Sequence, residues 1–106
     1  MWLLDIKNST RKNKKLKATF CLCEKKNACK GSNHDIVHFG QRGSETFIDG
    51  EGDGDLERKR NYIARHEKRE NWNVPISPAS LSRWLLWGPS TSITKNIAAF
   101  KKRFNV

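Results

Sequence analysis

The last third of the chain constrains the fold most strongly, because start and stop signals mark two short helices there. Ser77 is a typical N-cap residue, and Pro78 suits the first helical position. Gly88 and Pro89 end this helix, and Ser92 caps the next one. In the second helix, apolar residues recur every three or four positions, at Ile93, Ile97, Phe100 and Phe104. This spacing predicts an amphipathic helix packed through one apolar side.

Alternating apolar residues predict strands in the first half of the chain. The predicted strands are Leu16–Cys23, Asp35–Gly40 and Glu45–Asp49. Ala18 and Phe20 lie on one face of the first strand, because side chains alternate between the two faces. Gly, Asn, Ser and Lys residues in the connections are typical of turns. We therefore expect a small antiparallel meander.

The 106 residues are enough for one domain. We expect a basic N-terminal arm over residues 1–15, which orders against a partner, and a single α+β domain over residues 16–106. In this domain the three-stranded meander is followed by three helices. The first begins near Asp55, and the other two cover residues 78–87 and 93–103. The chain has no apolar run of the ~20 residues that a membrane span needs.

Two features argue against secretion. The apolar cluster at Trp2–Leu4 is shorter than the apolar stretch of about 7–15 residues in a signal peptide. Three cysteines do not all pair with one another, as they would in a secreted disulfide scaffold.

The net charge of +10 is unevenly spread. Residues 1–40 carry nine Lys or Arg and three acids, and residues 57–106 carry eleven and three, whereas residues 41–56 carry one Arg and five acids. A positive field of this size favours polyanionic partners, which include nucleic acid, acidic protein surfaces and membrane surfaces. The expected polyanion-binding residues are Arg11, Lys12, Lys14, Lys15, Lys17, Arg58, Arg65, Arg69, Lys101 and Lys102.

Five side chains able to bind metal occur close together in the sequence, at Cys21, Cys23, Cys29, His34 and His38. On a strand, Cys21 and Cys23 lie on the same face, so a tetrahedral zinc site is one interpretation. The Cys-x-Cys start, followed by five residues and one further Cys, matches no common zinc module. We favour free cysteines, and expect no metal and no cofactor.

Residues 49–55 place an acid at every second position, as at the start of a calcium-binding loop. The position of the closing bidentate ligand is occupied by Arg60, and a predicted strand precedes the loop. We favour a solvated loop in which Asp55 caps the following helix.

The two C-terminal helices have the size of a helix-turn-helix unit. In that interpretation Lys95, Asn96, Lys101 and Lys102 meet phosphates and base edges. The alternative, which we favour, is a helical hairpin packed on the sheet, with basic residues at the negative end of the helix dipole.

Tryptophans offer candidate interface anchors or stacking platforms. Leucines lie near Trp84 at helical spacing, which is typical of a core position, whereas Trp87 lies at the helix end. We expect Trp2 and Trp87 to be the interface anchors. An enzyme is not expected, because paired carboxylates, a nucleophile elbow and a phosphate loop are all missing, and no residue is identified as catalytic.

Five segments follow one another in a recognisable order. They are Val37–Gly40, Tyr62–His66, Asn71–Trp72, Leu81–Trp87 and Lys102–Phe104. Over about residues 16–106 the chain resembles an uncharacterised family of short basic proteins encoded by nucleocytoplasmic large DNA viruses. The resemblance implies a viral protein, but it implies no activity and no site. The turn at 21–34 and the loop at 49–55 depart from the family pattern.

Two functions therefore remain open. The first is a non-enzymatic structural protein of a virus particle, such as a minor capsid protein, that docks on acidic surfaces of other virion proteins. The second is a sequence-independent DNA-binding protein of viral packaging or regulation. Either function places the protein in the virion or in the cytoplasm or nucleus of the infected cell. The sequence leaves the oligomeric state open.

Overall fold

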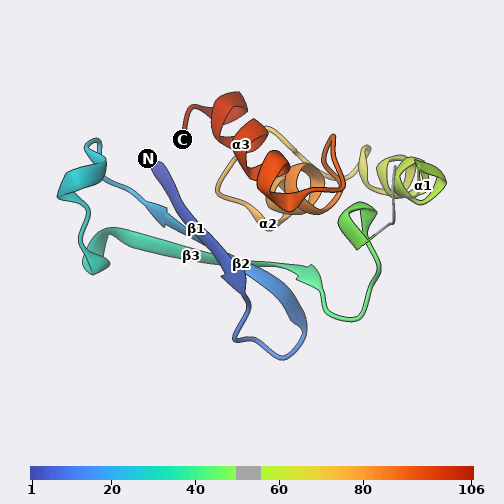
Figure 1. The fold of residues 1–106 in the computed structure, drawn as a ribbon, viewed down its shortest axis with the longest axis horizontal. Helices are drawn as coiled ribbons and strands as arrows, with labels where there is room; N and C mark the ends of the chain where they lie inside the picture. The colour runs from blue at the N-terminus through green and yellow to red at the C-terminus, as the bar shows by residue number, and fades with distance from the viewer. Residues whose placement is uncertain (50–55) are drawn as a thin grey trace.

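The computed structural model describes residues 1–49 and 56–106 and has an α+β fold. Its strands are β1 (Trp2–Asn8), β2 (Lys14–Cys21) and β3 (His34–Gln41). They form one antiparallel sheet in the order β1-β2-β3, and the helices follow in the sequence (Figure 1). The predicted class, a three-stranded antiparallel sheet followed by three helices, is confirmed.

The third predicted strand, Glu45–Asp49, is wrong. Residues Phe47–Asp49 form the short 3-10 helix η3 instead. The carboxylate of Asp49 accepts hydrogen bonds from the backbone N of Thr46 at 2.7 Å and from its Oγ1 at 2.8 Å. These local bonds close a turn, and such bonds compete with extended structure. The third strand of the sheet comes from the N-terminus.

The expected N-terminal arm is part of the sheet, which corrects the prediction that it orders only against a partner. Leu3 lies opposite Phe20, and Ile6 opposite Ala18, in the register of β1 with β2. The backbone N of Leu3 also donates to the carbonyl O of Val106 at 3.2 Å. The chain termini accordingly lie close together in Figure 1. The first residues are thus ordered by the chain's own sheet and C-terminus.

The helices begin and end near the predicted signals. They are α1 (Leu56–His66), α2 (Pro78–Leu81), which continues into the π-helical turn η4 (Ser82–Leu86), and α3 (Ile93–Phe104). The hydroxyl of Ser77 accepts from the N of Ser80, and that of Ser92 from the N of Lys95, so both predicted caps are confirmed. In the described part of the chain, no helix is long and apolar enough to cross a membrane. Two further 3-10 turns, η1 (Lys26–Ala28) and η2 (Gly31–Asn33), connect β2 to β3.

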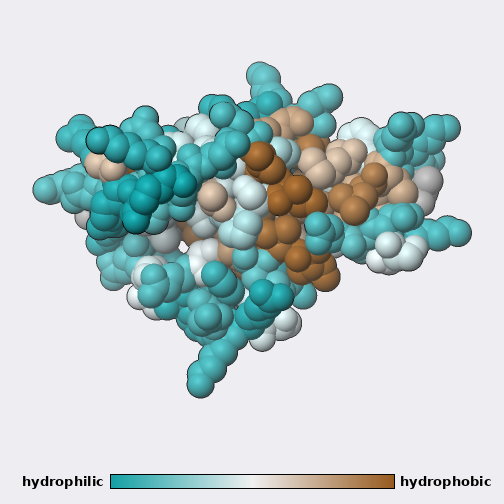
Figure 2. All heavy atoms as spheres, turned by 180° about the vertical axis from the view of Figure 1, so that it is seen from behind, coloured by the Kyte–Doolittle hydropathy of each residue, from teal (hydrophilic) through white to brown (hydrophobic). Residues whose placement is uncertain are grey.

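The core lies between one face of the sheet and the helical half. Phe20 and Phe39 from the sheet are completely buried, as are Leu81, Leu85 and, almost completely, Phe100 from the helices. Burial of each such side chain contributes roughly 1.5–3 kcal/mol to folding. Seen from behind, apolar side chains gather in one band near the middle of the molecule, and most of the surrounding surface is hydrophilic (Figure 2).

Candidate anion-binding pocket

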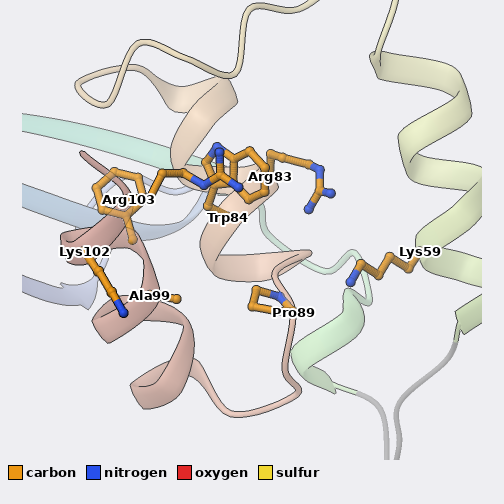
Figure 3. Close-up of a pocket in the computed structure, with 8 residues that line it drawn as sticks. Lys59, Arg83, Trp84, Pro89, Ala99, Lys102 and Arg103 are labelled. Carbon is orange, nitrogen blue, oxygen red and sulfur yellow. The ribbon is translucent and has the colours of Figure 1, made fainter. Parts of the chain in front are cut away.

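A pocket of about 450 Å³ opens between α1, η4 and α3 (Figure 3). The residues lining it are Lys59, Arg83, Trp84, Pro89, Ala99, Phe100, Lys102 and Arg103. Four of them are basic, and none of these eight described residues is acidic. We call this site the basic pocket. It combines an apolar, aromatic wall with four positive charges.

Two guanidinium groups lie over the indole of Trp84. The Cζ atom of Arg103 is 3.7 Å from the ring centroid, and that of Arg83 is 4.4 Å from it. Arg83 also lies 5.2 Å from the ring of Trp72. Such cation–π contacts contribute about 0.5–2 kcal/mol each, depending on desolvation. The indole N of Trp84 donates to the carbonyl O of Trp72 at 2.9 Å, which fixes the ring that positions both arginines.

The deeper cations are held by carbonyl oxygens and rings. Lys59 donates from Nζ to the carbonyl O of Gly88 at 2.8 Å and lies 4.6 Å from the ring centroid of Phe47. Arg83 donates from an Nη atom to the carbonyl O of Trp87 at 2.7 Å, whereas its buried Nε has no hydrogen-bond partner among the described residues. The pocket therefore contains a buried N–H donor that has no acceptor among the described residues.

The cations of the basic pocket repel one another, which makes the charged form of each less favourable. Burial lowers the pKa of Lys59, and the nearby Arg83 lowers it further. Burial also lowers the pKa of Arg83; Arg103 acts in the same direction, and Tyr62 and Glu67 oppose it. A bound anion would relieve this repulsion, because it adds an opposite charge next to partly desolvated cations.

One turn holds η4 against α3 and so shapes the pocket. Asn96 is completely buried; its amide N donates to the carbonyl oxygens of Leu85 at 2.9 Å and Ser90 at 2.7 Å, and its amide O accepts from the N of Ser90. A Cβ atom at Gly88 would lie only 2.2 Å from the carbonyl O of Trp84. The turn therefore requires both a glycine and an asparagine at these positions.

The same observation corrects the helix-turn-helix interpretation. Asn96 is committed to the turn and does not reach the surface, so it is not available to base edges. Lys95 remains exposed at the start of α3. The two C-terminal helices form a hairpin in which α3 packs on η4 and α2 packs on β3, in agreement with the favoured alternative.

The predicted polyanion-binding residues do not gather at one site, although Lys14, Arg58 and Arg65 line a second pocket together with Glu45 and Glu70. Lys15 pairs with Asp49 at 3.0 Å, and Arg58 pairs with Glu45 at 2.7 Å, so an acid already faces each of these two cations. Lys102 belongs to the basic pocket, and the half-buried Lys101 precedes it in α3.

On and just after α1, Arg69 donates to the carbonyl O of Arg65 at 3.0 Å. Both side chains are exposed, and the structure does not bring them to the basic pocket.

A second group gathers at the β1–β2 turn. We call Arg11, Lys12, Lys14 and Lys17 the hairpin cluster. Lys17 lies opposite His38 in the register of β2 with β3, and the Nδ1 of His38 is 2.7 Å from the Oγ of Ser9. Burial lowers the pKa of His38, and the charges of Arg11, Lys17 and Lys14 lower it further. The hairpin cluster is thus a second region of positive potential.

Sequence reasoning missed Lys59, Arg83 and Arg103 as members of the main site. The available signal was the basic residue next to Trp84 within an apolar helix, since a charge there needs compensation. Their convergence depends on how α1, η4 and α3 pack, which the local sequence does not specify.

The predicted tryptophan anchors behave differently from one another. Trp87 is only 6% exposed and stacks on Tyr62 with ring centroids 4.4 Å apart, so the prediction that it is a surface anchor is wrong. Tyr62 from α1 covers Trp87, which the sequence places at an exposed helix end. Trp2 is half-buried and donates from its indole N to the carbonyl O of Glu24 at 3.1 Å.

The expectation of three free cysteines is also wrong. A disulfide joins Cys21 to Cys29, and Cys23 remains a thiol. The acidic loop proposed for calcium or for helix capping falls on residues 50–55, which lie outside the described residues. Its first acid, Asp49, is described and accepts hydrogen bonds from Lys15 and Thr46.

Comparison with known proteins identifies a family. A family model described as a family of unknown function, DUF5754, matches residues 4–66. No curated protein and no solved structure matches the chain. The matched segment covers α1 and the sheet apart from the first two residues of β1, and of the residues lining the basic pocket it contains only Lys59. Because the match covers more than half of the chain, this protein belongs to the DUF5754 family.

Proposed function

We propose that this protein is a non-enzymatic docking protein that binds acidic partners through the basic pocket. The observation that carries the proposal is the set of four cations that line the basic pocket, two of them over the ring of Trp84, with which no carboxylate among the described residues forms an ion pair. Cations left without acidic partners in a partly apolar pocket favour an anion supplied from outside.

The partner that fits best is a protein surface carrying carboxylates next to apolar side chains. Carboxylates accept bidentate hydrogen bonds from guanidinium groups such as that of Arg103. Pro89, Ala99 and Phe100 offer an apolar wall for the neighbouring side chain. The ring of Trp84 already carries Arg83 and Arg103, so it is poorly suited to stacking a nucleic-acid base.

We further propose that the protein is a minor capsid or virion-associated component of a large DNA virus. This finer assignment rests on the resemblance of its segments to the viral family. In this proposal the acidic partners are other virion proteins, and the protein is located in the particle or in the infected cell.

A second candidate function, sequence-independent binding of nucleic acid, is favoured by the hairpin cluster. Arg11 and Lys12 are exposed, and Lys14 and Lys17 lie near them along the start of β2. Such a group can neutralise phosphates without reading bases. Binding through phosphates would weaken about 10³-fold or more between 50 and 200 mM salt for six or so contacts.

The two functions are separable with three charge-matched double variants. Lys102→Gln with Arg103→Gln changes the basic pocket, Arg11→Gln with Lys14→Gln changes the hairpin cluster, and Lys25→Gln with Lys26→Gln is the control at an exposed turn. Fluorescence anisotropy would measure binding of a labelled peptide of alternating glutamate and leucine, and of a random DNA duplex, across a salt series.

The docking proposal predicts that only the pocket variant loses peptide affinity, by about tenfold or more, because a hydrogen bond to a charged group contributes about 1.5–3 kcal/mol. Equal losses in the pocket variant and the control would contradict it, as would absence of peptide binding by the unchanged protein. Submicromolar DNA binding that disappears in the hairpin variant would favour the second function.

A further inference from the structure

The connection between β2 and β3 brings three sulfur atoms together. The Sγ atoms of Cys21, Cys23 and Cys29 all lie within 4.8 Å of one another. Cys21 is buried, and the other two are half-buried. We propose that these three cysteines and His34 form a zinc site when the Cys21–Cys29 disulfide is reduced.

The third cysteine is the main reason for this proposal. A disulfide needs two sulfurs, and Cys23 lies beside the bridge without taking part in it. Zinc in a structural site takes four ligands at tetrahedral positions, with zinc–sulfur distances near 2.3 Å, which places the sulfurs about 3.8 Å apart. The Cα atoms of Cys21 and Cys29 are 6.0 Å apart, so both sulfurs can reach one ion through side-chain rotation.

His34 is the best-placed fourth ligand. It lies directly opposite Cys21 in the register of β2 with β3, and opposite residues project from the same face of a sheet about 5 Å apart. Its side chain is exposed and has no hydrogen-bond partner among the described residues. His38 is four residues further along β3, roughly 13 Å away at the rise of a strand, and it is engaged with Ser9.

The backbone holds this loop in place without the help of the sulfurs. The N of Leu22 donates to the carbonyl O of Asn33 at 2.9 Å, and the N of Asn33 donates to that of Lys30 at 2.8 Å. Trp2, which lies opposite Cys21 on the other neighbouring strand, donates to the carbonyl O of Glu24. A loop fixed at several points loses little further entropy when it binds a metal.

The disulfide and the zinc site are alternative states of the same loop. A dithiol reductant supplies two electrons and two protons to the Cys21–Cys29 disulfide and is itself oxidised to a disulfide. The two thiols formed and the thiol of Cys23 release three protons to water as they bind Zn²⁺. A ring nitrogen of neutral His34 supplies its lone pair, and no further electron transfer is needed.

The test uses the full chain, reduced anaerobically with a phosphine and then titrated with Zn²⁺, and with Co²⁺ as a spectroscopic probe. We expect one metal ion per chain, with thiolate-to-cobalt charge-transfer absorption and the absorption bands of tetrahedral cobalt. The oxidised protein should bind no metal, because two of its ligands are in the disulfide.

Cys23→Ser is the decisive variant, because it leaves the disulfide pair and so the oxidised fold intact. We expect Cys23→Ser and His34→Ala each to weaken binding by more than about tenfold, the loss that even an outer-shell change can produce. His38→Ala is the matched control and should bind like the unchanged protein. The melting temperature of the reduced protein should rise on addition of Zn²⁺ in the unchanged chain, and should rise less at the same Zn²⁺ concentration in Cys23→Ser.

No metal binding by the reduced protein would overturn the proposal. Unchanged affinity in Cys23→Ser or in His34→Ala would also overturn the four-ligand site.

Discussion

The positive charges of basic side chains are balanced in different ways in two regions of the molecule. Near η3, Lys15 and Arg58 face the carboxylates of Asp49 and Glu45. In the basic pocket, the arginines instead meet the ring of Trp84 and a backbone carbonyl oxygen. The first arrangement pairs each charge within the chain, whereas in the second no ion pair forms among the described residues and Glu67 only partly offsets the charge of Arg83.

In our proposal, this difference separates a structural role from a binding role. A cation paired inside the protein contributes to the fold and has little to gain from an external anion. Cations that are partly buried without an acid keep their electrostatic potential available to a partner. The predictions below test this division.

The largest expected effect comes from the turn that builds the pocket. Asn96→Ala removes three hydrogen bonds, one to the buried carbonyl O of Leu85 and two to the partly buried backbone N and carbonyl O of Ser90. We expect the free energy of unfolding to fall by about 3 kcal/mol, at about 1 kcal/mol for each bond. Urea denaturation would measure it, with the exposed neighbour Lys95→Ala as control. A loss below 1 kcal/mol would show that the turn does not depend on Asn96.

A pair of single substitutions tests the division directly. Arg103→Gln should weaken binding of the acidic peptide about tenfold, which corresponds to 1.4 kcal/mol. It should lower stability by only about 0.5 kcal/mol, the low end of the range for an exposed cation–π contact such as that with Trp84. Lys15→Gln should lower stability by about 1 kcal/mol, because Lys15 bonds to Ser44 and Asp49, and leave peptide affinity unchanged. Binding calorimetry and urea denaturation of both variants would test this. A loss of peptide affinity in Lys15→Gln together with a larger loss of stability in Arg103→Gln than in Lys15→Gln would contradict the division.

The Asp49 interaction has a pH signature. Burial alone would raise the pKa of Asp49, but hydrogen bonds from Lys15 and Thr46 outweigh it and lower the pKa below its ordinary value of 3.8. Because the pKa is lower in the folded state, this contribution is complete above about pH 5 and is lost as the pH falls through the folded pKa.

The stability difference between the unchanged protein and Asp49→Asn should therefore shrink below pH 3.8. Its size should stay below about 1 kcal/mol at neutral pH, because the Asp49 side chain is 39% exposed and solvent screens the pair. Denaturation at several pH values measures it. A difference that grows in acid would contradict the assignment.

The smallest expected effect concerns the hairpin cluster. The pKa of His38 lies below its ordinary value of 6.5 because of burial and the charges of Arg11, Lys17 and Lys14. Arg11→Gln with Lys14→Gln should raise this pKa toward 6.5, and added salt should raise it in the unchanged protein by screening. An NMR titration of the His38 ring would detect both shifts, whereas an unaltered pKa would mean that the cluster exerts no field there.

Local signals predicted the fold class and most elements, because they depend on neighbouring residues. Ser77 and Ser92 cap helices as their side-chain chemistry requires. The third strand was misassigned because Asp49 closes a local turn. The sequence indicates an arm over residues 1–15 because the Lys and Arg residues there outweigh the short apolar segment, which in fact pairs with β2 as β1.

The candidate site was largely beyond prediction because it depends on packing between segments that are distant in the sequence. Lys102 was identified from its charge alone. Lys59 and Arg103 lie 44 residues apart in the sequence and meet only when α1 packs near α3. The burial of Trp87 depends on Tyr62, which comes from another helix.

The most direct test of the central claim is an NMR titration of the isotope-labelled protein with the glutamate–leucine peptide. The indole N–H of Trp84 and the side-chain signals of Arg103 and Lys102 report on the basic pocket, and those of Arg11 and Lys14 on the hairpin cluster. We predict that the pocket signals shift together and saturate, while the hairpin signals stay in place. Shifts confined to the hairpin cluster, or no saturable shift at Trp84, would contradict the assignment of the basic pocket as the docking site.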